Sequence, residues 1–157
     1  MTCLTMNFQL TIPAILRRAE TLFGDKQVVS ELPDKTLYRY TYRELARHAT
    51  KLAIALQKLG VKPGDRVATL CWNHHRHLEI YFGVMAIGAV LHTLNLRLHA
   101  NDLAYIANHA EDKVILVDEE LLPVLDSFRQ RVDFKHIIVV GSARASTPTR
   151  RRAATWR

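Results

Sequence analysis

The sequence predicts an α/β domain in which a parallel sheet carries helices on both faces. Three observations favour this fold class. From Val67 onward, short apolar runs alternate with helical patterns in the order strand, helix, strand, helix, strand, helix, strand. The runs at 67–72, 113–118 and 136–140 lack the alternation of half-exposed strands, as buried parallel strands do. A length of 157 residues with 48% hydrophobic residues suffices for one domain with a core.

The first 41 residues predict a helix followed by a β-hairpin. Thr11 can cap a helix over residues 11–25, and Gly24 can end it. The runs 26–32 and 36–41 then read as two strands joined by a turn at Pro33-Asp34.

The second helix has the clearest local signal. Thr41 and Glu44 form a capping box, in which each side chain satisfies a free backbone donor of the first turn. Gly60 supplies the C-terminal stop. The apolar positions between them define a stripe that should be buried: Leu45, Ala49, Leu52, Ala53, Leu56 and Leu59.

The remaining elements follow in regular order. A turn at 61–66 precedes the strand 67–72, and Asn73 can cap a helix over 74–88. This helix is apolar on nearly every side from Ile80 onward, which predicts burial on all sides. After it we expect a strand at 89–95, a helix at 100–110, a strand at 113–118, a helix at 119–131 and a strand at 136–140.

Charge is distributed unevenly along the chain. Five of the 22 basic residues lie in 142–157 with no acidic residue, which leaves 17 basic against 15 acidic residues in the first 141 positions. The body of the protein is therefore nearly neutral, and we expect no nucleic-acid partner. A basic arm for nucleic acid or an anionic surface stays as an alternative for 142–157.

The two cysteines, Cys3 and Cys71, indicate neither a disulfide framework nor a metal knuckle. No apolar run is long enough to span a bilayer, and no secretory signal pattern opens the chain. We therefore expect no transmembrane segment and a cytoplasmic location.

One polar cluster, "NHHRH" at 73–77, is a candidate for chemistry. His74 and His77 lie three positions apart on one helical face, a spacing that metals use, but no further ligand completes that face. A polar helix entrance above a cleft is the favoured interpretation, so we expect no metal site. Nothing in residues 1–141 assembles a nucleophile, a base and an oxyanion site, and we assign no catalytic residue.

The sequence and the order of its motifs resemble the N-terminal part of the AMP-forming acyl-CoA synthetases. The resemblance rests on "TYREL" at 41–45, "LGVKPGDRVA" at 59–68, "NHHRHLEIYFGVMAIGAVLHTLNLRL" at 73–98 and "DLAYIANHAEDKV" at 102–114. The motifs "GAVLHTLN" and "NHAEDKV" are similar to those of the synthetases that act on medium- or long-chain fatty acids. Small departures are Leu96 and Ala100, where relatives commonly have proline, and these concern loop geometry only.

The resemblance implies a reaction in which a fatty acid, ATP and coenzyme A give acyl-CoA, AMP and pyrophosphate through an acyl-adenylate, with Mg²⁺. It covers about the first quarter of such an enzyme. The Ser/Thr/Gly-rich phosphate loop, the stretch that binds adenine and magnesium, the ribose-binding Asp and the C-terminal lysine do not occur in this sequence. We therefore expect a fragment that is inactive alone and takes no cofactor by itself.

The predicted organisation has three parts. Residues 1–10 are an overhang, 11–141 are the incomplete N-terminal portion of an AMP-binding domain, and 142–157 form a disordered basic tail that a frameshift would explain. The resemblance also implies that residues 1–40 can support homo-dimerisation. A folded module that pairs with a full-length paralogue is the alternative function. In an intact relative, Asn73, His74 and His77 would lie at the carboxyl end of a sheet strand and contact the acyl chain or coenzyme A.

Overall fold

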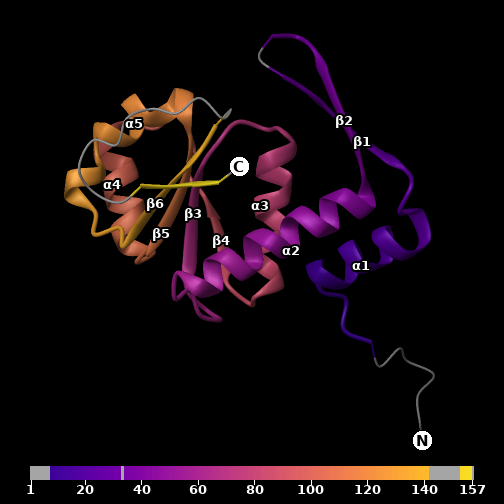
Figure 1. Ribbon diagram of the computed structural model, residues 1–157. Helices are drawn as coiled ribbons and strands as arrows, with labels where there is room; N and C mark the ends of the chain where they lie inside the picture. Colours follow the sequence, from indigo (N-terminus) through magenta and orange to yellow (C-terminus); the bar gives the residue numbers. More distant parts are fainter. Residues whose placement is uncertain (1–7, 33, 142–152, 157) are drawn as a thin grey trace, which may run out of the picture.

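A five-stranded parallel sheet in the order β4-β3-β5-β6-β7 organises the protein, and a separate two-stranded hairpin lies beside it (Figure 1). The structure is a computed structural model that describes residues 8–32, 34–141 and 153–156. It confirms the predicted α/β class, with a parallel sheet and an antiparallel hairpin.

The N-terminal elements agree with the sequence prediction. Helix α1 spans Ile12–Phe23 with Thr11 as its N-cap. Strands β1 (Gln27–Glu31) and β2 (Leu37–Thr41) form the hairpin. Helix α2 (Tyr42–Lys58) begins at the predicted capping box, because the Thr41 side chain accepts from the Glu44 N–H while the Glu44 carboxylate accepts from the Thr41 N–H at 2.8 Å.

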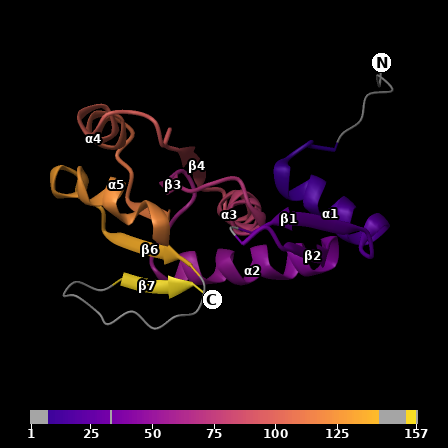
Figure 2. The ribbon, with the colours of Figure 1, turned by 90° about the horizontal axis from the view of Figure 1, so that it is seen from above.

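The second part of the chain alternates strands and helices. The strands are β3 (Arg66–Leu70), β4 (Val90–Thr93), β5 (Val114–Asp118), β6 (His136–Val140) and β7 (Ala153–Trp156). The helices are α3 (His75–Ala86), α4 (Ala100–His109) and α5 (Leu122–Asp126), with single 3-10 turns at Glu119–Leu121 and Arg129–Arg131. In Figure 2, α4 and α5 lie on the opposite side of the sheet from α2.

Buried apolar side chains fill both faces of the sheet, as the continuous apolar runs predict. On one face, Val67 and Leu116 pack in a cluster with Leu56 of α2 and Val84 of α3. On the other, residues of β3 and β5 pack against Leu103 of α4, Leu125 of α5 and the fully buried Phe128. Burial of each such side chain stabilises the fold by roughly 1.5–3 kcal/mol.

Three sequence predictions about helices are wrong. The N-cap of α3 is His74 and not Asn73, because the imidazole offers an acceptor to the first turn. Helix α3 is not buried on all sides, since Tyr81 stays exposed. The segment 119–131 is not one helix: it breaks into α5 and the two 3-10 turns, and Pro123, which has no N–H to donate, lies in the first turn of α5.

The predicted tail falls mostly outside the described residues, as do Cys3, Pro33 of the predicted hairpin turn and most of the overhang 1–10. Within the tail, residues 153–156 form β7, which pairs in parallel with β6. This strand is a correction to the expectation of a wholly disordered segment. Within the described residues, no helix has both the length and the apolarity that crossing a membrane requires. The cytoplasmic location stays a prediction.

Candidate functional site at the carboxyl edge of the sheet

The predicted site residues lie where β3 ends and α3 begins, at the carboxyl edge of the parallel sheet. Open α/β sheets bind ligands at this edge, because the loops that leave parallel strands meet there. The loop after β3 carries Trp72 and Asn73, and His74 opens the helix. The neighbouring strand β5 ends at Asp118.

Asp118 is the central polar group of this edge. Its carboxylate is buried and accepts a hydrogen bond from the Trp72 backbone N–H at 2.7 Å. Both of its oxygens also lie 3.0 Å from Nε2 of His74. One carboxylate on β5 therefore holds the loop that follows β3.

His74 uses both of its ring nitrogens. While Nε2 faces Asp118, Nδ1 accepts a hydrogen bond from the His77 backbone N–H at 3.2 Å and so caps α3. The ring is only partly exposed. With no free lone pair, His74 cannot act as a general base or a metal ligand in this conformation.

His77 points into the protein. Its side chain is buried, and Nε2 lies 3.1 Å from the Thr69 hydroxyl. Burial and the neighbouring His74 lower the pKa of His77, although the Asp118 charge and the Trp72 backbone oppose that shift. The imidazole is therefore neutral at pH 7 and serves as an internal contact between α3 and β3.

Asn73 and Trp72 are the exposed groups of the loop. Trp72 is 50% exposed, although it is a large aromatic side chain. Asn73 is exposed as well, and its side chain makes no hydrogen bond among the residues that the structure describes. Of the three predicted site residues, Asn73 is the one whose side chain makes no hydrogen bond within the described residues.

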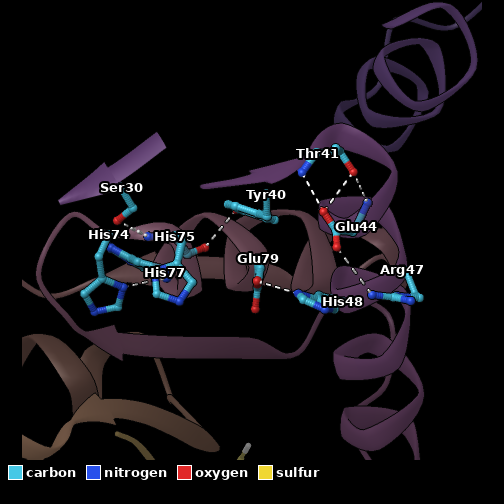
Figure 3. A network of polar contacts seen from close by, with 10 residues as sticks. All are labelled: Ser30, Tyr40, Thr41, Glu44, Arg47, His48, His74, His75, His77 and Glu79. Atoms are coloured by element: carbon cyan, nitrogen blue, oxygen red, sulfur yellow. Dashed lines mark hydrogen bonds and ion pairs between the residues drawn. The ribbon is translucent and has the colours of Figure 1, made fainter. Parts of the chain in front are cut away.

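The hairpin closes one side of this region. The Ser30 hydroxyl of β1 accepts from the His75 N–H at 3.1 Å, and the Tyr40 hydroxyl of β2 donates to the His75 carbonyl at 3.5 Å (Figure 3). The His75 ring lies 4.4 Å from the Tyr38 ring, centroid to centroid. Burial, helped by the charge of Arg76, lowers the pKa of His75 to about 4.

A shallow cavity of about 470 Å³ lies between β1 and the start of α3. Its volume is within the range of small-molecule sites, roughly 300–1,000 Å³. The lining combines apolar side chains with polar groups and one acidic residue, Glu31; Val29, Asn73, His77 and Tyr81 also line it. Because the lining has a carboxylate and no Lys or Arg side chain, it suits an uncharged or apolar group better than a phosphate.

The described residues favour neither a metal site nor a reactive cysteine. Among residues 8–32 and 34–141, no group of three His, Cys, Asp or Glu side chains is arranged to hold a metal ion. Cys71 is buried, and burial together with the Asp118 charge raises the pKa of its thiol, so it stays protonated and unreactive at neutral pH.

Sequence reasoning missed Asp118, Thr69 and Trp72. Asp118 could have been found from the sequence, because it stands at the end of a predicted buried strand. The carboxyl end of that strand lies at the same edge of the sheet as the loops that leave the neighbouring parallel strands. The contact between Thr69 and His77 had no comparable signal, since it depends on how α3 crosses the sheet.

Comparisons with known proteins agree with the fold and the residue pattern. Residues 16–155 match the family model described as AMP-binding enzyme. A long-chain-fatty-acid–CoA ligase of Thermus thermophilus is 48% identical over 136 residues, covering 86% of this chain and 25% of the relative. A medium-chain-fatty-acid–CoA ligase of Ectopseudomonas oleovorans is 42% identical over 120 residues, covering 76% of this chain and 22% of the relative.

The structure also resembles solved ligases. An anthranilate CoA ligase in complex with anthranoyl-AMP superposes with a TM-score of 0.76 at 26% identity, covering 85% of this chain and 25% of that one. The chain spans about a quarter of the length of the curated relatives it matches. The matched range of the family model includes positions 142–155 of the predicted tail.

Proposed function

Because this chain belongs to the AMP-binding enzyme family, we propose that it forms the N-terminal portion of an ATP-dependent fatty-acid–CoA ligase. The intact enzyme would join a fatty acid to coenzyme A through an acyl-adenylate, releasing pyrophosphate and then AMP. The observation that carries the proposal is the 48% identity to a long-chain-fatty-acid–CoA ligase over 86% of this chain.

We propose further that the chain does not catalyse adenylation alone. ATP and Mg²⁺ need a phosphate cradle and free carboxylates. The described residues do not fit these groups, because no three of their His, Cys, Asp or Glu side chains are arranged to hold a metal ion, and the carboxylate of Asp118 is already bonded to Trp72 and His74. No step of the reaction is therefore assigned to this chain's side chains, and nucleotide chemistry would belong to segments that its relatives have beyond the matched quarter.

The proposed role of the chain within the enzyme is to form one wall of the substrate cleft. Asn73 and the half-exposed Trp72 would face the acyl chain or the uncharged arm of coenzyme A. His74 and His77 would support that wall from within, since their ring nitrogens already have protein partners.

A chimeric ligase tests this proposal. Residues 16–141 of this chain would replace the matching segment of the Thermus thermophilus ligase, and acyl-CoA formation from a long-chain acid would be assayed. We expect the chimera to form acyl-CoA and the 157-residue chain alone to show no ATP–pyrophosphate exchange. Exchange by the chain alone would contradict its proposed inactivity, and a folded but inactive chimera would contradict the family function.

A second proposal concerns partner binding by residues 1–40. Helix α1 buries only Leu16, while the apolar side chains of Ile12, Ile15, Leu22 and Phe23 stay exposed. Four exposed apolar side chains on one short helix favour contact with a second copy or a full-length paralogue. Light scattering would show a dimer that the double variant Ile15→Ser, Leu22→Ser converts to a monomer. A monomeric parent chain would contradict the proposal.

A further inference from the structure

One buried carboxylate controls two parts of the same loop. Asp118 bonds the Trp72 N–H, which lies just before Asn73, and the His74 ring, which lies just after it. Asn73 is thus held from both sides by a residue 45 positions further along the chain, on another strand. No other described side chain makes a hydrogen bond to this loop from β5.

The two contacts of His74 determine its protonation. A backbone N–H can only donate, so the Nδ1 atom that receives the His77 N–H must be unprotonated. The proton of the neutral ring is then on Nε2, where it points at the two oxygens of Asp118 at 3.0 Å. The carboxylate favours this tautomer, because the other tautomer would set two acceptors against each other.

The tautomer in turn determines whether α3 is capped. With the proton on Nδ1, His74 could not accept from His77, and the first turn of α3 would keep only one side-chain acceptor, the Ser30 hydroxyl on the His75 N–H. The His77 N–H would then have no side-chain acceptor, although Ser30 and Tyr40 would still hold His75. The cap therefore depends on Asp118, which never touches the helix backbone that it stabilises.

We propose that Asp118 is a positioning residue, whose carboxylate holds His74 in the Nε2–H tautomer and thereby fixes the loop that presents Trp72 and Asn73. The inference rests on the proposed function only in that this loop faces a ligand. The physical coupling from Asp118 through His74 to α3 does not depend on catalysis.

A second histidine–aspartate pair provides an internal control. Asp112 bonds His92 through Nδ1, at 2.8 Å and 3.0 Å, and no backbone cap depends on that ring. Asp112→Asn therefore removes the same charge from a similar pair without acting on α3.

The test uses the full 157-residue chain. Long-range ¹H–¹⁵N NMR reports which ring nitrogens of the histidines are protonated, and hydrogen exchange reports the protection of the backbone amides. We expect the spectrum of His74 to show a protonated Nε2 and an unprotonated Nδ1. In Asp118→Asn, the side-chain amide can donate to Nε2, so the Nδ1–H form should gain population. Protection of the His77 amide should fall by about two- to thirty-fold, the range for loss of a cap.

A rescue variant separates positioning from general destabilisation. His74→Asn supplies a capping oxygen that needs no help from Asp118, so the His77 amide should keep its protection within about twofold. In that background, Asp118→Asn should no longer change His77 protection, whereas it should still shift the Trp72 amide resonance. Asp112→Asn should leave the His74 tautomer unchanged.

Two outcomes would overturn the proposal. A protonated Nδ1 in the parent chain would contradict the tautomer directly, and this measurement needs no variant to fold. An equal loss of His77 protection on Asp118→Asn with either His74 or Asn at position 74 would show that Asp118 acts on stability alone. Neither result bears on whether a chimeric ligase is active, so failure of the proposed function would be recognised separately.

Discussion

The two edges of the parallel sheet use charged residues in different ways. At the amino edge, side chains of neighbouring segments pair with one another: Asp65 with Lys113 at 2.6 Å, Arg66 with Glu111 at 2.6 Å, and the His92 ring with Asp112 at 2.8 Å. At the carboxyl edge, the buried carboxylate of Asp118 bonds a backbone amide and a neutral imidazole instead. The amino edge thus joins elements, whereas the carboxyl edge shapes a loop.

We propose that this difference separates an edge that serves stability from an edge that serves a ligand. The amino-edge pairs connect residues of β3 and β4 with the turns that follow α2 and α4. The carboxyl edge leaves Trp72 half-exposed and Asn73 unbonded, next to a cavity of about 470 Å³. Buried polar groups that hold an exposed loop in place are typical of binding sites, where loops on a rigid scaffold carry the functional residues.

The largest expected effect on stability comes from the amino edge. Asp112→Ala leaves the partly buried His92 without its acceptor, so the free energy of unfolding should fall by about 1–3 kcal/mol. Asp112→Asn keeps an acceptor and should cost less. Urea unfolding followed by circular dichroism measures both variants. A loss below about 0.5 kcal/mol for Asp112→Ala, the size of an ordinary surface change, would remove the amino edge's role in stability.

A pH dependence should come from the carboxyl side. The pKa of His75 in the folded chain is about 4, below the ordinary value of 6.5 for histidine. Between these pH values the unfolded chain therefore binds a proton at His75 that the folded chain does not bind. Stability should therefore fall as pH decreases through this window, by at most about 1.4 kcal/mol per pH unit.

The variant His75→Phe tests this pH dependence. It keeps a ring against Tyr38 and removes the titrating group together with the buried Nδ1 atom that has no partner among the described residues. Urea midpoints at pH 6.5, 5.5 and 4.5 should decline less steeply than in the parent chain. The slope should not vanish, because the pKa of His77 is lowered as well. Equal slopes for parent and variant would contradict the assignment to His75.

The smallest effect on stability should come from the loop itself. Asn73 is exposed and makes no side-chain hydrogen bond within the described part of the chain, so Asn73→Ala should change the free energy of unfolding by less than about 0.5 kcal/mol. Thermal and urea unfolding measure this change. A loss above about 1 kcal/mol would show that Asn73 is structural, and the contrast between the two edges would weaken.

Much of the fold follows from sequence patterns that act locally. The capping box at Thr41 and Glu44 and the buried stripe of α2 depend on residues three or four positions apart. Both are present, except that Leu59 at the end of the stripe is only partly buried. The continuous apolar runs of β3, β5 and β6 predict strands covered on both faces, which the two core clusters confirm.

The parts that could not be predicted depend on contacts between distant residues. His74 replaces Asn73 as the N-cap because Asp118, 44 positions away from His74, orients the ring. Helical periodicity places His74 and His77 on one face, but it cannot show that one ring caps the helix while the other meets Thr69 inside the protein. The exposed stripe of α1 likewise follows the predicted period, although only Leu16 of α1 is buried.

The most direct test of the contrast between the edges measures kcat/KM for acyl-CoA formation by the chimeric ligase. One variant of the chimera carries Asn73→Ala, and a matched control carries Gln57→Ala on the exposed surface of α2. Both changes should leave stability almost unchanged. We expect Asn73→Ala to lower kcat/KM by about tenfold or more, because a misplaced substrate contact can cost up to 10²-fold, and Gln57→Ala to stay within about twofold. Equal kcat/KM values for the two variants would contradict the assignment of the carboxyl edge as the ligand side.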